Sequence, residues 1–487
     1  MNKKILSGLV LIFSLFLFSS FAMAADLYVD DDGKADGTSC NSLTNAYSTI
    51  GSAVSAAISN DIIHVCPGTY TEQVIINKAL TLKGPNFGID PNTGTRVSEA
   101  TIKTDDLFDH QAVLIEASDV TVDGFTLYGP SGGPDPHPKD IGAIGLTSSG
   151  ARTNVHIQYN SIFRTAGGTD WKCDGIRLDP PSNADASIYV EHNLINVGDT
   201  IQSAGNNDIT LADIGYKNSP AGAAWIIGSP DRVVIKNNYL YGHSKMYIEG
   251  IGVLIDNNKF LGIWGPIEVR GSKDVVISNN EMMDQTDVAM YVWSPKTGNS
   301  GAGLCSDIII TDNFIEGMKL DPQVFTDEGT GIILGGVTNV LVTKNTIKNG
   351  AGSGVVIGGE NYDHFDPNWG LAVGPYQPVN NVINYNNIFG NTLFGVRVDA
   401  TVTSGTPIDA IKNWWGSDTG PGSVGPGSGD KVTKNVNFDP WLCMPYPPAI
   451  VSVNGKCPRQ AIPSLSPIMM ISLLLVLLFI GAKRIKV

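Results

Sequence analysis

The stretch VHIQYNSI, residues 155–162, carries the pattern that decides the fold: apolar, any, apolar, two of any residue, Asn, any, apolar. Further copies of this pattern begin at Ile188, Val233, Val253, Val275, Ile308 and Val340. Apolar residues two apart point to one face of a strand. The Asn between them tolerates the positive φ of a turn. Each copy therefore predicts a short strand, a bend and a second short strand.

Two weaker copies extend the repeat at both ends. VINYNNIF, residues 382–389, has Asn384 where the second apolar residue belongs. VTVDGFTL, residues 120–127, has Phe125 in the Asn position. Coils stacked on one another would align these Asn residues, so we expect their amides to hydrogen-bond along a ladder.

A third apolar strand precedes most copies, and it sets the length of one turn of the chain. Such strands begin at Gly175, Pro266, Val288, Gly331, Gly354 and Gly395. Its outward positions are 21 residues apart from Ile226 to Tyr247, 21 from Tyr247 to Glu268, and 23 from Glu268 to Tyr291. This length leaves no room for a crossover helix, and a β-propeller repeats at about twice this length. We therefore predict an all-β, right-handed parallel β-helix of three-stranded coils, in which the interval from Arg177 to Ile226 is one coil with a surface insertion.

The repeat resembles that of the parallel β-helix superfamily, which includes pectate lyases, polygalacturonases and carbohydrate-binding β-helix proteins. Residues 62–84, IIHVCPGTYTEQVIINKALTLKG, resemble the opening of many exported β-helix proteins, including pectin methylesterases. Residues 413–416, NWWG, are similar to the sequence that ends many bacterial surface β-helices. The resemblance covers most of the chain and implies its architecture, but it implies no particular chemistry.

Both ends of such a solenoid need a cap. Residues 46–58 place Ile50, Val54, Ala57 and Ile58 at helical spacing, which predicts an amphipathic helix over the N-terminal end. At the other end, we expect Trp414 and Trp415 to cap the last coil in preference to forming a sugar-stacking platform, because Trp buries readily.

The terminal segments predict export. Residues 1–24 have the basic start, apolar stretch and Ala-Met-Ala ending of a signal peptide. The apolar run at residues 467–482 is followed by a basic cluster, so it would hold the body outside the cytoplasm. Residues 462–465, IPSL, resemble the IPTL-type sorting signals of Gram-negative surface proteins, which implies removal of the tail by a membrane peptidase. Because IPSL departs from IPTL, a plain membrane anchor remains the alternative, and both readings predict a cell-envelope or cell-surface protein.

These features divide the chain. We expect a signal peptide (1–24), an N-terminal cap (25–60), the parallel β-helix (61–419), a linker and Cys-containing segment (420–461) that begins with a Gly/Ser/Pro-rich linker at 420–429, and a sorting or anchor tail (462–487).

Composition excludes one class of partner and suggests two disulfides. A net charge of −15 with only 16% charged residues argues against nucleic-acid binding. The six cysteines suit an oxidising compartment. Their spacing suggests the pairs Cys40–Cys66 and Cys443–Cys457 and leaves Cys173 and Cys305 unassigned. We expect a monomer.

The catalytic motifs of the related enzymes are absent. There is no QDT or DFIFG segment of a pectin methylesterase, and Asp170 and Asp174 lack the companion DD and GHG segments of a polygalacturonase. The histidines show no metal-ligand spacing. Asp30, Asp31, Asp32 and Asp36 could hold Ca²⁺, but the Gly and ligand spacing of a calcium loop is imperfect, which favours a solvated acidic turn. We therefore predict no metal and no cofactor other than this calcium alternative.

The outward positions of the third strand give the candidate site. They form two columns, which run Arg177, Ile226, Tyr247, Glu268, Tyr291 and Asp179, Gly228, Glu249, Arg270, Trp293. Coils stack about 4.8 Å apart, so aromatic rings and charged groups would lie side by side, as a sugar chain requires. The predicted substrate-binding residues are Arg177, Asp179, Tyr247, Glu249, Glu268, Arg270, Tyr291 and Trp293. This hypothesis requires Tyr247, Tyr291 and Trp293 to be exposed together.

Glu249 and Glu268 are the candidate catalytic pair, because their diagonal backbone separation of roughly 8 Å is compatible with an inverting glycosidase. The alternative is an ordinary ion pair between Glu249 and Arg270 on neighbouring coils. Insertions at 180–186, 294–306 and 359–379 could wall a groove beside them. We therefore expect an exported surface protein that binds polysaccharide, with cleavage as a lyase or glycoside hydrolase left open. The alternative is a non-catalytic structural or adhesive surface protein.

Overall fold

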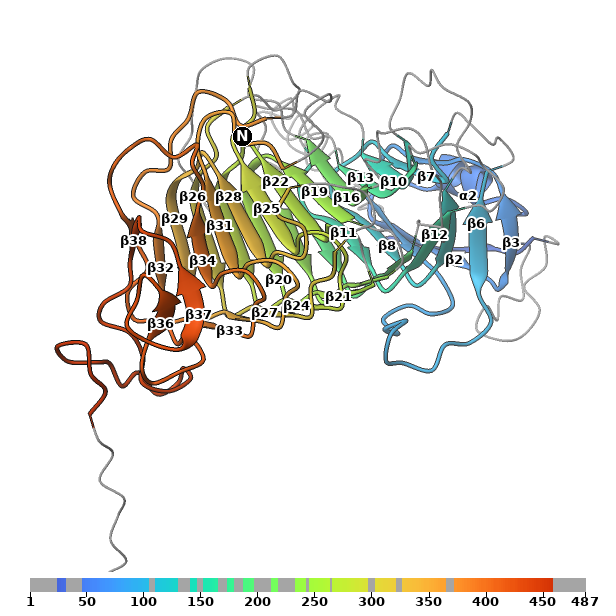
Figure 1. Ribbon diagram of the computed structural model, residues 1–487. Coiled ribbons are helices and arrows are strands. Elements are labelled where there is room, and N and C mark those ends of the chain that lie inside the picture. The colour runs from blue at the N-terminus through green and yellow to red at the C-terminus, as the bar shows by residue number, and fades with distance from the viewer. Residues whose placement is uncertain are drawn as a thin grey trace, which may run out of the picture.

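The computed structural model describes residues 24–31, 46–104, 110–129, 141–146, 152–164, 173–178, 187–196, 212–217, 233–241, 245–262, 265–296, 303–320, 326–364 and 372–458. These residues form a right-handed parallel β-helix, an elongated solenoid of three-stranded coils (Figure 1). Three parallel sheets run along it with 14, 11 and 13 strands within the described ranges, and we call them sheets A, B and C. The fold class predicted from the repeat is confirmed.

The strands are distributed over the three sheets as follows. Sheet A contains β1 (Asp26–Val29), β2 (Asp61–Val65), β5 (Leu80–Lys83), β8 (Val120–Asp123), β11 (Val155–Gln158), β14 (Ile188–Glu191), β17 (Val233–Lys236), β20 (Ile251–Asp256), β23 (Lys273–Ser278), β26 (Ser306–Thr311), β29 (Thr338–Thr343), β32 (Val382–Asn384), β35 (Ile408–Asp409) and β38 (Val436–Asn437). Sheet B contains β3 (Gly68–Thr71), β6 (Ala100–Lys103), β9 (Thr126–Gly129), β12 (Ser161–Arg164), β15 (Leu194–Asn196), β18 (Tyr239–Tyr241), β21 (Lys259–Leu261), β24 (Glu281–Met283), β27 (Phe314–Glu316), β30 (Thr346–Lys348) and β33 (Asn387–Phe389). Sheet C contains β4 (Val74–Ile76), β7 (Val113–Ile115), β10 (Ile141–Leu146), β13 (Cys173–Leu178), β16 (Ala212–Lys217), β19 (Lys245–Glu249), β22 (Ile267–Arg270), β25 (Met290–Trp293), β28 (Ile332–Gly335), β31 (Val355–Gly358), β34 (Val396–Val398), β37 (Gly429–Val432) and β36 (Pro421–Ser423).

The core is built by the apolar positions of the repeat. In each copy the first strand lies in sheet A and the second in sheet B, and equivalent residues pair from coil to coil, as Val155 does with Ile188 and Ile188 with Val233. These side chains are fully buried in one continuous apolar core. Since each coil covers the apolar face of the next, the solenoid is stabilised coil by coil.

The Asn of each repeat forms the predicted ladder at the corner between sheets A and B. The Asn ladder contains Asn160, Asn193, Asn238, Asn258, Asn280, Asn313, Asn345, Asn386 and Asn413, all of them buried. From Asn160 to Asn386, each Nδ2 donates to the Oδ1 of the next ladder residue at 2.9–3.2 Å. The same Oδ1 accepts the backbone N–H of the ladder residue in the previous coil, as between Asn258 and Asn280 at 2.9 Å. The ladder therefore satisfies polar groups that the core would otherwise leave unpaired.

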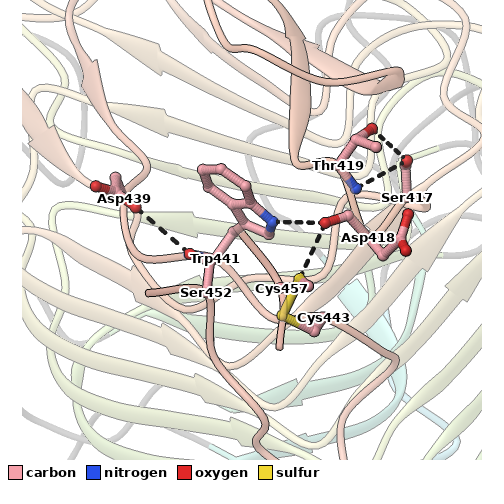
Figure 2. The surroundings of a disulfide bond; sticks show 8 residues. All are labelled: Ser417, Asp418, Thr419, Asp439, Trp441, Cys443, Ser452 and Cys457. Atoms are coloured by element: carbon pink, nitrogen blue, oxygen red, sulfur yellow. Dashed lines mark hydrogen bonds between the residues drawn. A yellow bond between two sulfur atoms is a disulfide. The ribbon is translucent and has the colours of Figure 1, made fainter. Parts of the chain in front are cut away.

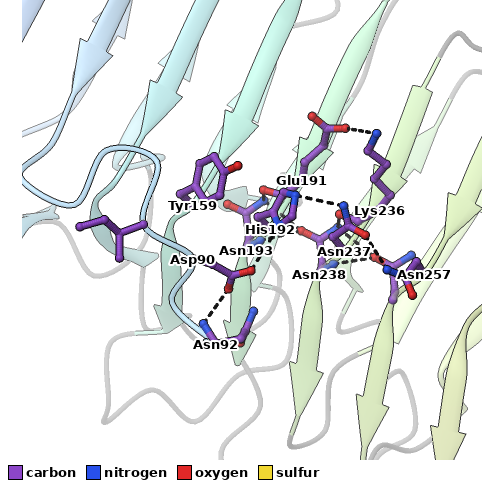
Figure 3. A network of polar contacts seen from close by, with 12 residues as sticks. Asp90, Asn92, Tyr159, Glu191, His192, Asn193, Lys236, Asn237, Asn238 and Asn257 are labelled. Carbon is purple, nitrogen blue, oxygen red and sulfur yellow. Dashed lines mark hydrogen bonds and ion pairs between the residues drawn. The ribbon is translucent and has the colours of Figure 1, made fainter. Parts of the chain in front are cut away.

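The bend itself falls one residue earlier than the sequence suggested. The left-handed conformation belongs to the residue before each ladder Asn, for example Tyr159 (φ 55°), His192 (φ 56°) and Asn237 (φ 57°). These residues line the outside of the corner, where His192 contacts Asp90 at 3.1 Å and Asn237 at 3.0 Å (Figure 3). A left-handed residue turns the chain, which leaves the Asn after it free to point inward.

The weakest copy of the repeat is also shifted by one residue. Ile383 pairs with Val342 in the core position, and Asn386 joins the ladder. Asn384, which the sequence placed in an apolar position, instead accepts a hydrogen bond from Thr343 at 2.8 Å. The ladder bond of Asn386 sets this register.

The N-terminal end is capped by a helix, as predicted, but the helix is shorter. Helix α2 spans Ile50–Ala56, buries Ile50, Ala53 and Val54, and lies over the first coils (Figure 1). The Glu72 carboxylate accepts the N–H groups of Ile50 and Gly51 at 2.7 and 2.8 Å, which suits the positive end of a helix. Ile58 lies beyond the helix and is 45% exposed, so its predicted place in the plug is wrong. Strand β1 pairs with β2, so the solenoid includes residues assigned to the cap.

The C-terminal end is closed by two tryptophans and a disulfide. Trp415 is buried in the core, as capping predicts, whereas Trp414 is half-buried. Trp441 donates its Nε1–H to the Asp418 carbonyl at 3.1 Å beside the Cys443–Cys457 disulfide (Figure 2). The predicted linker at 420–429 is wrong, because β36 and β37 pair with each other and β37 pairs with β34.

The structure tests part of the predicted disulfide pairing. The predicted Cys443–Cys457 bond is confirmed. Cys66 is disulfide-bonded, but Cys40 lies outside the described residues, so that pairing stays a prediction. Cys305 is free and buried, and burial raises the pKa of its thiol to about 12. The side chain of Cys173 is not described.

The predicted signal peptide and tail also fall outside the described residues, apart from Ala24. Among the helices that are described, none has the length and apolar character to span a bilayer.

Candidate functional site

The predicted columns lie on the outer face of sheet C, but both β16 positions differ, since Lys217 pairs with Glu249 where the sequence placed Gly228. Coil by coil, Arg177 pairs with Gly215, Gly215 with Tyr247, Tyr247 with Glu268 and Glu268 with Tyr291. Gly215 of β16 therefore occupies the place that the sequence gave to Ile226. Ile226, Gly228 and Asp179 lie outside the described residues.

Apolar residues that point inward alternate with these columns. Leu178, Ile248, Val269 and Val292 are fully buried in the core. Their alternation with outward residues follows from the period of two along a strand. We call Tyr247, Glu249, Glu268, Arg270, Tyr291 and Trp293 the sheet C cluster.

Glu268 lies at the centre of the cluster. Its Oε1 accepts hydrogen bonds from Arg270 Nη2 at 2.8 Å and from Trp293 Nε1 at 3.0 Å. The Arg270 guanidinium lies between two rings, 4.6 Å from the Tyr247 centroid and 4.9 Å from that of Trp293. Burial alone would lower the pKa of Arg270, but Glu268 and the other negative neighbours outweigh it and raise the pKa above its ordinary value.

Glu249 is the second carboxylate of the cluster and is only 2% exposed. Its Oε1 accepts the Tyr247 hydroxyl and lies 3.7 Å from Arg270 Nη1. Burial is the main reason that the pKa of Tyr247 lies well above its usual value, so the phenol keeps its proton and donates. Among the described residues, Glu249 Oε2 has no hydrogen-bond partner. Buried polar atoms are rarely left in this state, so this oxygen has capacity for a further donor.

The open aromatic platform that the sequence predicted is not present. Tyr247 is 8% exposed, Tyr291 4% and Trp293 0%. The Tyr291 and Trp293 rings stack on each other, with centroids 5.2 Å apart and planes 2° from parallel. Both residues belong to a second apolar cluster with Val288, Ile333, Val356, Tyr362 and Val373. The prediction of joint exposure is therefore wrong, and the reason is a segment from elsewhere in the chain.

That segment is the described part of the predicted insertion at 359–379. We call residues 359–364 and 372–379 the cover. It is anchored to the neighbouring insertion by the N–H of Gly374, which donates to the Ser294 carbonyl at 2.8 Å, and by a bridge between Pro295 and Val373. A Cβ at Gly335 would lie 2.7 Å from the Val373 side chain and 3.1 Å from Trp293 Cβ. Gly335 therefore has to be a glycine for the cover to pack this closely.

Two polar contacts fix the cover from inside. The Tyr362 hydroxyl donates to Asp327 Oδ2 at 2.6 Å, and the same oxygen accepts from Arg397. His364 is completely buried and contacts Asp287 through Nε2 at 3.1 Å. Burial lowers the pKa of His364, but Asp287 and the neighbouring acceptors outweigh this and raise the pKa above its ordinary value.

The sequence gave no reason to connect Asp287, Asp327 and His364 with the sheet C cluster. Asp287 and Asp327 both have positive φ, 71° and 64°, and lie in turns before sheet C strands. A possible signal is an Asp in such a turn, because Asp and Asn tolerate this conformation. Nothing in the sequence, however, shows which histidine reaches Asp287.

No described group of three or more His, Cys, Asp or Glu side chains is arranged to hold a metal ion. Of the calcium candidates, Asp31 accepts the Thr69 N–H at 3.2 Å and Asp30 is buried. Asp32 and Asp36 lie outside the described residues.

Comparison with known proteins agrees with this architecture. Residues 174–362 and 253–408 match the family model of the right handed beta helix region. These matches agree with the right-handed parallel β-helix fold that the three parallel sheets show. A search of curated protein sequences finds no match.

Several solved structures are similar to the chain. The A-module of a mannuronan C-5 epimerase from Azotobacter vinelandii is 14% identical, with 85% of this chain and 99% of that chain covered and a TM-score of 0.42. DFA-IIIase from Arthrobacter chlorophenolicus without its lid is 12% identical, with coverage of 77% and 89% and a TM-score of 0.41. An alginate lyase from Paenibacillus is 12% identical, with coverage of 64% and 92% and a TM-score of 0.31. At these identities and TM-scores the similarity says nothing about activity.

Proposed function

We propose that the protein binds a polysaccharide or surface glycan on the outer face of sheet C, with the sheet C cluster as the recognition centre. The observation that carries the proposal is the Glu249 carboxylate, which is buried among donors and keeps one oxygen without a partner in the described residues. Two carboxylates and a guanidinium buried together cost folding free energy. Perturbed, buried charges concentrate at functional sites.

The chemistry of the cluster suits a polyhydroxylated ligand. Carboxylates and guanidinium groups form strong, directional hydrogen bonds with hydroxyl groups, and the indole and phenol rings add apolar contact. In the described conformation, the cover occupies the space over Tyr291 and Trp293. The open groove predicted from the sequence is therefore ruled out in this conformation, and the present proposal instead requires the cover to move before a glycan can bind.

The cluster supports binding more than cleavage. Glu249 and Glu268 both lie within ion-pair distance of Arg270, at 3.7 and 2.8 Å. A glycosidase needs one carboxyl group that donates a proton to the leaving group, whereas here both carboxylates face the same guanidinium. We therefore propose recognition without cleavage.

The localisation belongs to the same proposal. The segments 1–24 and 462–487 have the features of a signal peptide and of a sorting or anchor tail. We propose an exported monomer at the cell envelope or surface, released if the tail is processed. The Cys443–Cys457 disulfide is compatible with an oxidising compartment.

One observation favours a second function. The burial of Tyr247, Tyr291 and Trp293 is also what a non-catalytic structural or adhesive surface protein would show, since the cluster would then serve only to anchor the cover.

A carbohydrate microarray separates the two functions. We expect the purified full-length protein to bind at least one polysaccharide, with turnover of that ligand assayed in parallel. Glu268→Gln, which keeps the shape and removes the charge, should weaken binding at least tenfold. Lys259→Gln, at an exposed ion pair on sheet B, is the matched control and should bind normally. No binding by the wild type, or unchanged binding by Glu268→Gln, would favour the structural function.

A further inference from the structure

His364 is the point at which the cover is held to the solenoid by charge. Its Nδ1 lies 2.5 Å from the Thr326 carbonyl oxygen, and its Nε2 lies 3.1 and 3.2 Å from the two Asp287 carboxylate oxygens. Carbonyl and carboxylate oxygens accept hydrogen bonds, so both ring nitrogens must donate. A histidine that donates from both nitrogens is an imidazolium cation. The geometry therefore specifies a buried ion pair.

Titratable groups from several elements face His364. The facing titratable groups are Asp287 before β25, Asp327 in the segment before β28, and the phenol of Tyr291, whose ring meets the imidazole edge-on at 5.3 Å. Asp363 and Tyr362 flank His364 in the cover itself. Loss of the proton would leave Asp287 buried without its counter-charge, which is the costly state of a buried ion pair.

The same residue joins the cover to the sheet C cluster. Tyr291 stacks on Trp293 and also meets the His364 ring edge-on. Two residues earlier, Tyr362 packs in the apolar cluster that buries both rings. Release of His364 would therefore loosen the part of the cover that lies over Trp293.

We infer that the His364–Asp287 pair is a pH-sensitive latch that holds the cover closed over the sheet C cluster. The claim that the latch controls glycan access rests on the proposed function. The pH-dependent opening of the cover can be measured without any glycan, so the latch and the proposed function can fail separately.

The direction of the pH dependence follows from the pKa of His364, which the anionic neighbours raise above its ordinary value. A group whose pKa is raised on folding contributes stability that is fully present below the unfolded pKa of about 6.5. That contribution is lost as the pH rises through the folded pKa. The latch is therefore closed in acid and opens toward alkaline pH.

Hydrogen exchange of the full-length protein, read by mass spectrometry at about pH 6 and about pH 9, tests the latch on both sides of the unfolded histidine pKa. After correction for intrinsic exchange, we expect protection of the cover to fall by about tenfold or more between the two values. His364→Gln cannot carry the charge, so its cover should be poorly protected at both values. Asp287→Asn should behave in the same way.

The matched control is His192→Gln, at a half-buried histidine between Asp90 and Asn237 on the far corner of the solenoid. Its cover should keep the wild-type pH response. Peptides from residues 253–260 report whether each variant retains the Asn ladder. If the wild-type cover is equally protected at both values, or if His364→Gln keeps the wild-type pH response in a folded solenoid, the inference is overturned.

Discussion

The Asn ladder and the sheet C cluster are two rows of polar side chains on the same solenoid, and they are satisfied in opposite ways. Each ladder amide bonds to the equivalent residue of the next coil, as Asn258 does to Asn280 at 3.0 Å. The cluster is heterogeneous, with Glu268 bonded to Arg270 and Trp293, and it is buried by a segment from elsewhere in the chain. A repeat can therefore supply its own partners inside the solenoid, whereas its outer face depends on whatever insertion covers it.

The largest expected effect on stability comes from a substitution in the Asn ladder. Asn280→Ala removes the acceptor shared by the backbone N–H and the Nδ2–H of Asn258. Each buried donor that loses this acceptor costs about 1–3 kcal/mol, so the free energy of unfolding should fall by about 2–6 kcal/mol. Chemical denaturation measures this. Asn92→Ala, at an exposed position, is the control, and equal effects of the two changes would contradict the ladder's role.

The next largest effect should come from the charge at the centre of the sheet C cluster. Arg270→Met leaves Glu249 and Glu268 buried without their shared cation, which should lower the free energy of unfolding by about 3–5 kcal/mol. Lys259→Met breaks an exposed ion pair with Glu281 and should cost about 0–1 kcal/mol. Similar losses for both variants, measured by denaturation, would show that the cluster is not a buried ionic centre.

A smaller effect separates two fully buried indoles. Trp293→Phe deletes an N–H that donates to Glu268 at 3.0 Å, so it should cost about 1.5–3 kcal/mol, as for a hydrogen bond to a charged group. In contrast, Trp415 Nε1 is buried at the C-terminal cap with no partner among the described residues. Trp415→Phe should therefore cost less than Trp293→Phe. A larger loss of unfolding free energy in the Trp415 variant would contradict the stabilising role of the Trp293 hydrogen bond.

The difference between the Asn ladder and the sheet C cluster explains which contacts could be predicted from the sequence. The ladder was predictable because Asn160 and its equivalents recur at one position of the repeat, and each contact is made to the neighbouring coil. The pairing of Tyr247 with Glu268 and of Glu268 with Tyr291 followed from coil length in the same way. The predicted register failed at Ile226, because Gly215, earlier in the chain, occupies that place.

The burial of the cluster could not be read from the sequence. The insertion at 359–379 was predicted as a wall for a groove, but the packing of Tyr362 and Val373 over Trp293 depends on a path that no repeat constrains. The pairing of His364 with Asp287 spans 77 residues and is made once. Contacts that occur once leave no periodic signal.

The central claim is that the sheet C cluster binds carbohydrate once the cover moves, and a binding titration with the strongest microarray ligand tests it most directly. Asp287→Asn should bind several-fold more tightly than the wild type at about pH 6, because apparent affinity rises with the fraction of molecules that can bind. Adding Glu268→Gln to Asp287→Asn should abolish that binding. Equal affinity of all three proteins would contradict the account, because neither the cover nor the cluster would then contribute to recognition.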